Sequence, residues 1–225
     1  MSPRNIIRRA IEMHIDILGI SDHNSTKHGP LMRKLGRENG VFVLTGAEVT
    51  SREEVHCLTF FENDVQLALF QKYLEDNIIP FPNDPGRFGY QIVVDEYDNI
   101  LEEEENLLIY CIDQSIDQIE KVVHENNGLF IPAHVNRRIN SIISQLGFVP
   151  ADINADALEI SRHISKNEFL GLNPYLSDFT FIQSSDAHFP EDIGRVQTVF
   201  RMQDISFKEI SMALAKKDGR EVVVP

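Results

Sequence analysis

The sequence predicts an α/β domain built on a parallel sheet that is either open or closed into a barrel. Predicted strands and helices alternate along most of the chain, which is the pattern of parallel strand–helix units. Four short apolar runs end in His, Asp or Glu, and polar groups at the ends of buried strands are typical of α/β barrel active sites. With 225 residues, 42% of them hydrophobic, the chain suits one such domain with its own core.

The first part of the chain contains two of these strand ends, one at Asp22 and His23 and the other at Glu48. Ser2 and Pro3 are the N-cap and first residue expected of a helix. The apolar run 16–20 reads as a buried strand that ends in Asp22 and His23. Asp64 is expected to cap a later helix. The predicted elements are, in order, helix 3–14, strand 16–20, helix 28–39, strand 41–48, strand 54–61 and helix 64–77.

The pattern breaks over residues 80–112, where proline and glycine mark a loop and short apolar stretches suggest a hairpin. We interpret this segment as an insertion over one end of a single barrel domain that spans residues 1–225. Alternation then resumes after Ser115, which is expected to cap a helix. The remaining predicted elements are helix 115–127, strand 129–134, helix 138–146, strand 157–161, helix 165–171, strand 179–184, strand 196–201 and a helix opened by Ser206.

The candidate functional residues lie at these strand ends. Carboxylates and imidazoles are ligands for Zn, Mn or Fe. Asp186 and His188 are two residues apart, so on an extended strand both side chains point to one side. His163, next to Arg162, follows another predicted strand and is a candidate for substrate contact. The candidate metal-binding set is Asp22, His23, Glu48, His56, His134, Asp186 and His188.

The motifs that carry these residues resemble those of the PHP family, the polymerase and histidinol phosphatase superfamily of metal-dependent phosphoesterases. The matching stretches are Ile-Ser-Asp-His-Asn, Thr-Gly-Ala-Glu-Val-Thr with the following Glu-Val-His, Ile-Pro-Ala-His-Val, and Ser-Ser-Asp-Ala-His-Phe-Pro-Glu-Asp-Ile-Gly. The resemblance covers essentially the whole chain. It implies a distorted seven-stranded (β/α) barrel of TIM-like type, with up to three divalent metal ions at the C-terminal ends of the strands.

The resemblance also implies a role for each candidate. Glu48 would bridge the first and second metals, His56 and His134 would complete the second, Asp186 would bind the first, His23 and His188 would bind the third, and Asp22 would orient ligands. The family's opening His-x-His on the first strand has no match in this sequence. We therefore expect the chain to lack that first strand, and only the second metal site to keep all its ligands.

The predicted function is metal-dependent hydrolysis of a phosphate ester, either a phosphomonoester or a small phosphodiester, with a metal-bound hydroxide as nucleophile. A histidine, His188 or His163, could protonate the leaving oxygen. Two alternatives remain open: a non-catalytic or impaired metal-binding domain, and a metal-dependent amidohydrolase. The candidate phosphate-binding cations are Arg137, which is preferred because it lies three residues after His134, and Arg138, Arg162 and Arg195.

Composition restricts the partners. The formal net charge of −14 argues against general nucleic-acid binding, so we expect a small phosphorylated substrate. No apolar run is long enough for a membrane span, and no signal peptide is recognisable, so we expect a cytoplasmic protein that could form homo-oligomers. Cys57 and Cys111 are expected to be reduced thiols.

Overall fold

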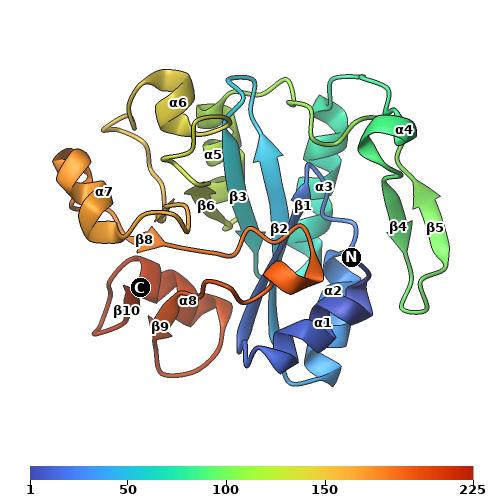
Figure 1. Cartoon of the computed structure of the whole chain (residues 1–225), viewed down its shortest axis with the longest axis horizontal. Helices are drawn as coiled ribbons and strands as arrows, with labels where there is room; N and C mark the ends of the chain where they lie inside the picture. The colour runs from blue at the N-terminus through green and yellow to red at the C-terminus, as the bar shows by residue number, and fades with distance from the viewer. Residues whose placement is uncertain (225) are drawn as a thin grey trace.

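A four-stranded sheet in the order β1-β2-β3-β6 forms the centre of the fold in the computed structural model (Figure 1). The structure describes residues 1–224. The strands of this sheet are β1 (Ile17–His23), β2 (Phe42–Thr50), β3 (His56–Phe61) and β6 (Leu129–Pro132). Strand β1 pairs with β2 in parallel, whereas β3 pairs antiparallel with both β2 and β6. The central sheet is therefore mixed.

The prediction of a purely parallel sheet is wrong at β3. Residues 51–55 alone join β2 to β3. A parallel connection needs a crossover of a dozen or more residues, whereas a short turn can join only antiparallel neighbours. The turn thus places the start of β3 next to the end of β2, which brings His56 opposite Thr50 in the register.

The structure does not show the predicted closed seven-stranded barrel among residues 1–224. Strands β7 (Leu158–Glu159) and β8 (Phe181–Ile182) form a separate parallel pair of two residues each, and β9 (Val199–Arg201) pairs antiparallel with β10 (Glu221–Val223). Isolated backbone hydrogen bonds link β6 to β7: Asp156 donates to the Phe130 carbonyl at 2.9 Å, and Val135 to the Glu159 carbonyl at 2.8 Å. Strands β6 and β7 therefore lie side by side, but they do not form one continuous ladder of hydrogen bonds.

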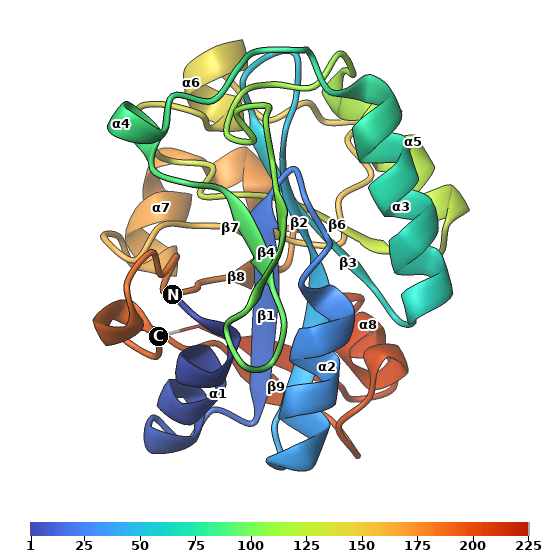
Figure 2. The same ribbon diagram turned by 90° about the vertical axis from the view of Figure 1, so that its right-hand side faces the viewer.

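Helices cover the sheet, and Figure 2 shows α3 and α5 together on one side. On β2 the side chains alternate: Ala47 and Val49 pack in the core with α3 and α5, whereas Leu44 packs on the opposite face with α8. Glu48 follows the same alternation onto the Leu44 face. No described helix has the length and apolar character needed to cross a lipid bilayer. Outside residues 80–112 the helices are α1 (Pro3–Glu12), α2 (Gly29–Glu38), α3 (Asp64–Asn77), α5 (Ile116–Glu125), α6 (Ile142–Leu146), α7 (Lys166–Leu172), α8 (Phe207–Leu214) and the 3-10 turns η1 (Pro174–Leu176) and η2 (Pro190–Asp192).

Helix caps follow the sequence with two corrections. Ser2 stands at the N-cap position of α1, but its side chain makes no capping hydrogen bond. Ser115 and Ser206 cap α5 and α8 as predicted, each accepting a backbone hydrogen bond from the first turn. The cap of α3 is Asn63 rather than Asp64: the Asn63 side chain accepts from the backbone N–H groups of Val65 and Gln66. Asn63 lies one position before the predicted cap Asp64 and binds the free backbone N–H groups of the first turn, so the predicted and observed caps differ by one residue.

Residues 80–112 contain helix α4 (Pro85–Phe88) and an antiparallel hairpin of β4 (Ile92–Val94) and β5 (Ile100–Glu103). The hairpin stands beside the central sheet in Figure 1 and lies in front of β1 in Figure 2. Lys27 holds it through ion pairs with Glu102 and Glu104, and the Val94 backbone N–H donates to His28 Nε2 at 3.2 Å. The segment that follows β1 is thereby tied to the hairpin.

Candidate metal centre and active site

Glu48 lies among three imidazoles that come from three different parts of the sheet. Its Oε1 is 3.1 Å from His56 Nδ1 and 3.4 Å from His134 Nε2, and its Oε2 is 3.5 Å from His23 Nδ1. His23 is the last residue of β1, His56 is the first residue of β3, and His134 follows β6. In the parallel register His23 stands opposite Glu48, so the pairing of β1 with β2 brings these two residues together.

The donors in this cluster fit a divalent metal ion. Glu48, His56 and His134 are 7%, 5% and 3% exposed. Among the described residues, His23 Nδ1 and both ring nitrogens of His134 are buried without a hydrogen-bond partner, although a carboxylate oxygen lies nearby. One atom each from His23, Glu48 and His56 fall within 4.8 Å of one another. Buried imidazoles converging on a carboxylate are the donor set of zinc and related ions.

The electrostatics of the cluster support that use. Burial raises the pKa of Glu48, but the imidazoles of His134 and His56 outweigh this and hold it well below its ordinary value. Burial lowers the pKa of His23, and the nearby Glu48 carboxylate offsets only part of that effect. Glu48 is therefore ionised and His23 is neutral near pH 7, which are the forms that bind metal.

Asp186 and His188 lie beside this cluster. The ring centroids of His23 and His188 are 6.2 Å apart, and His188 Nδ1 is 3.8 Å from Asp186 Oδ1. The other carboxylate oxygen, Asp186 Oδ2, is 2.7 Å from Arg137 Nη2. His188 is mostly exposed, whereas Asp186 is half-buried. The structure thus brings six predicted metal-binding residues to one end of the sheet: His23, Glu48, His56, His134, Asp186 and His188.

Asp22 is placed differently. It neighbours His23 on β1, and successive side chains of a strand point to opposite faces. Its Oδ2 lies 3.1 Å from His28 Nδ1, and its side chain is half-exposed. Asp22 therefore contacts His28 instead of the imidazoles around Glu48.

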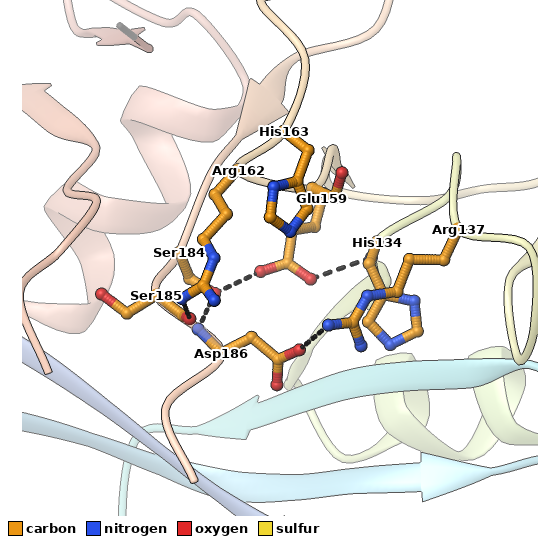
Figure 3. A pocket seen from close by; sticks show the side chains of 9 residues that line it. His134, Arg137, Glu159, Arg162, His163, Ser184, Ser185 and Asp186 are labelled. Carbon is orange, nitrogen blue, oxygen red and sulfur yellow. Dashed lines mark hydrogen bonds and ion pairs between the residues drawn. The ribbon is translucent and has the colours of Figure 1, made fainter. Parts of the chain in front are cut away.

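A pocket adjoins the cluster on the side of β7 and β8 (Figure 3). Arg137 and His163, both predicted from the sequence, face it, as does Arg162, whose Nη1 donates to the Ser185 carbonyl at 3.3 Å. Arg138 and Arg195, the other candidate cations, are not among its lining residues, and Arg195 pairs with Asp192 at 2.6 Å. The lining residues are His134, Arg137, Glu159, Ser161, Arg162, His163, Ser184, Ser185 and Asp186.

Sequence reasoning missed three residues that support the site. Glu159 is a buried carboxylate in the pocket wall, and its position at the end of an apolar run was the same signal that identified Glu48. Asn24 donates from Nδ2 to the carbonyls of Leu108 and Tyr110 at 2.8 and 2.7 Å. It lay within the motif that carries His23.

Asn140 had no recognisable signal. Its Nδ2 is 3.0 Å from His56 Nε2, and its carbonyl accepts from the His56 backbone N–H at 3.0 Å. These contacts need the left-handed φ of 56° that Asn140 adopts. They explain why helix α6 starts at Ile142 and not near residue 138, as we had predicted.

Comparison with known proteins finds a family model that matches one segment of the chain, and two relatives that match part of it. A family model described as PHP-associated matches residues 177–218, the segment that includes Asp186 and His188. Over this segment the match supports the resemblance to the PHP family. The uncharacterized Bacillus subtilis protein YqxK is 31% identical over 119 residues, which cover 47% of this chain and 28% of YqxK. A Methanocaldococcus jannaschii relative, MJ1587, is 34% identical over 67 residues, 30% of this chain and 39% of the relative, so the chain spans well under half of either relative.

Two solved structures share the fold of this chain. Endonuclease Q from Pyrococcus furiosus, a lesion-specific endonuclease, superposes with a TM-score of 0.70 at 18% identity and covers 97% of this chain and 52% of the endonuclease. A proposed metal-dependent phosphoesterase from Bifidobacterium adolescentis gives a TM-score of 0.56 at 18% identity, with 96% of this chain and 91% of the other covered. At 18% identity these comparisons show a shared fold alone.

One of these comparisons corrects a prediction. We had excluded nucleic acid as a partner because the net charge is −14. An endonuclease Q structure with the same fold holds a 27-mer duplex with an abasic lesion at its active site; its TM-score is 0.67 at 19% identity, over 96% of this chain and 52% of that chain. The exclusion is therefore wrong. Net charge describes the whole surface, whereas a phosphate backbone meets only the local potential, and exposed Arg137 and Arg162 line the pocket at this site.

Proposed function

We propose that this chain is a PHP-type metal-dependent hydrolase that cleaves phosphate esters. The observation that carries the proposal is the buried Glu48 carboxylate among three imidazoles, next to a pocket lined by Arg137 and Arg162. A metal-binding centre beside two guanidinium groups suits a substrate that is anionic at the reacting group. Phosphoryl transfer depends mainly on positioning and on neutralising charge, and these are the two things that this arrangement offers.

The residues that would hold metal are the cluster around Glu48 and the neighbouring pair. His23, Glu48, His56 and His134 would share one ion, and Asp186 with His188 would supply ligands for another. Zinc and manganese are the ions that we propose, because imidazole and carboxylate ligands suit both. A bound ion would supply Lewis-acid activation of water and of a phosphate oxygen.

The pocket side chains would bind and orient the substrate. The guanidinium of Arg162 faces the pocket, and a planar guanidinium can donate two parallel hydrogen bonds to phosphate oxygens. Arg137, paired with Asp186 at 2.7 Å, would add positive charge at the same wall. His163 is exposed at the mouth, where an imidazole can give a proton to a leaving oxygen.

The experiment is a substrate panel on metal-loaded protein. It contains an aryl phosphomonoester, an aryl phosphodiester, a duplex DNA with an abasic site, and an aryl amide. We expect turnover of at least one phosphate ester with Mn²⁺ or Zn²⁺. Glu48→Gln should reduce turnover by more than about 100-fold, because losing even an outer partner of a metal ligand costs about 10–100-fold.

The matched control is Glu209→Gln, which removes another buried carboxylate charge, the one paired with Arg220. This variant should keep wild-type turnover. Metal binding without turnover of any phosphate ester would contradict the proposal and favour a non-catalytic metal-binding domain. Turnover of the amide alone would identify an amidohydrolase instead.

A further inference from the structure

Glu159 is a buried carboxylate whose two oxygens both accept hydrogen bonds from segments that carry candidate metal ligands. It is the last residue of β7 and is 3% exposed. Its Oε2 accepts from the backbone N–H of His134 at 2.9 Å, and its Oε1 accepts from the Ser184 hydroxyl. Figure 3 shows the carboxylate between these two partners. Glu159 thus connects the segment after β6 to the segment after β8.

Both segments have strained backbones at the candidate ligand itself. His134 has a φ of 30° and Asp186 a φ of 45°, in the left-handed region that residues other than glycine seldom adopt. Such conformations persist only where the surrounding structure holds them. Glu159 holds the first directly through the His134 N–H. It reaches the second through Ser184, whose Oγ accepts from the Asp186 backbone N–H at 3.3 Å.

Packing alone gives no reason for a carboxylate at this position. Leu158 and Ile160, its neighbours on the chain, are fully buried apolar residues of the core. A buried carboxylate is unfavourable unless hydrogen bonds compensate for its lost hydration. Here the compensating donors belong to the two segments that carry His134 and Asp186.

We propose that Glu159 is a positioning residue that holds His134 and Asp186 in one geometry, by accepting from the His134 N–H and the Ser184 O–H at the same time. The role deepens the proposed function, since it concerns the same metal centre. Glu159 itself binds no metal in this proposal. It sets the directions in which the side chains of two separate strand ends point.

Three variants test separately the hydrogen bonds that Glu159 accepts from the His134 N–H and from the Ser184 hydroxyl. Glu159→Leu removes both acceptors and leaves the His134 N–H buried without a partner. Glu159→Gln keeps an amide oxygen for the His134 N–H, and its NH₂ group can donate to Ser184 Oγ, because a hydroxyl both accepts and donates. Ser184→Ala breaks only the connection to Asp186. Glu209→Leu is the matched control, a buried carboxylate that pairs with Arg220.

The first measurement is the affinity of each purified variant for Mn²⁺ by titration calorimetry. Glu159→Leu should bind Mn²⁺ about 10–100-fold more weakly, the usual effect of losing a group that orients a metal ligand. Glu159→Gln should recover most of the affinity, and Ser184→Ala should fall between the two. Glu209→Leu should bind as the wild type does. Wild-type affinity in Glu159→Leu, or no recovery in Glu159→Gln, would overturn the proposal.

The second measurement does not need metal or turnover. Hydrogen exchange of the His134 and Asp186 amides in metal-free protein should become faster in Glu159→Leu and stay slow in Glu159→Gln. Ser184→Ala should affect only Asp186. Unchanged exchange in Glu159→Leu would overturn the proposal even if the wild type proved inactive on every phosphate ester. If Glu159→Leu does not fold, Ser184→Ala tests the proposal instead. Unchanged hydrogen exchange of the Asp186 amide in Ser184→Ala would refute the connection from Glu159 to Asp186 through Ser184.

Discussion

Gly46 on β2 gives the sharpest test of how the sheet positions the metal centre. A Cβ atom added at this residue would lie 1.5 Å from the Thr59 carbonyl oxygen, 2.6 Å from the Thr59 carbonyl carbon and 2.9 Å from the Phe60 Cα. All three are backbone atoms of β3, so no side-chain rotation can relieve the contact. Because β2 lies between β1 and β3, the strand cannot move away without breaking a ladder.

The magnitude follows from that geometry. Gly46→Ala must separate β2 from β3 by more than an ångström, and overpacking a rigid site costs about 1–3 kcal/mol. Each ladder hydrogen bond lost would add roughly 1 kcal/mol. A loss of about 3 kcal/mol lowers the melting temperature of a domain of this size by roughly 6–12 °C. Glu48 lies two residues further along the same face, so its carboxylate would move as well and metal affinity should fall.

The assay is thermal unfolding followed by circular dichroism, together with Mn²⁺ titration of the folded protein. Gly171→Ala is the matched control: Gly171 lies in α7, and a Cβ there would meet nothing within 4 Å. In a helix, alanine is more stable than glycine by about 0.5–1 kcal/mol, so this control should melt at or above the wild-type temperature. Equal melting temperatures for Gly46→Ala and the wild type would refute the reasoning.

Three further predictions concern the metal centre and two ion pairs. His134→Ala should remove most bound Mn²⁺ while the protein stays folded, because one buried imidazole beside Glu48 is lost. Hydrogen bonds from Arg220, the larger cause, and from the Gln203 backbone N–H lower the pKa of Glu209 to about 2. The stabilising effect is present above the ordinary value of 4.5 and is lost as pH falls toward 2, so Arg220→Met should weaken this acid dependence. The hydrogen bond to Asp156 raises the pKa of His124, so its stabilising effect is present below 6.5 and is lost as pH rises through the folded-state pKa; Asp156→Asn should destabilise more at pH 5.5 than at pH 8.

Each of these three has a contrary outcome. Unchanged Mn²⁺ content in His134→Ala would remove that residue from the metal centre. Urea unfolding between pH 2 and 4.5 measures the Glu209 effect, and identical pH profiles for Arg220→Met and the wild type would contradict it. The His124 prediction fails if Asp156→Asn loses the same stability at both pH values.

The sequence by itself determined which side chains are candidates for the site. His23, Glu48 and His134 each stand at the end of an apolar run, whereas His56 stands at the start of one. A polar residue at the end of a buried strand is delivered to one edge of a sheet. Local signals of this kind need no knowledge of the fold, which is why candidate ligands could be proposed and the caps of α5 and α8 predicted. Glu159 carried the same signal and was overlooked.

Only the tertiary structure decided how these residues meet. The antiparallel direction of β3 depends on a turn too short for a crossover, and the register of β1 against β2 places His23 opposite Glu48. Asn140 contacts His56 although the two residues are 84 positions apart in the chain, and nothing in the residues around Asn140 indicates that contact. Contacts between distant residues depend on the packing of the whole chain, whereas capping and strand ends depend on neighbours a few residues apart. Net charge misled us for the same physical reason: it sums the entire surface, and a binding site responds to the few charges that folding gathers around it.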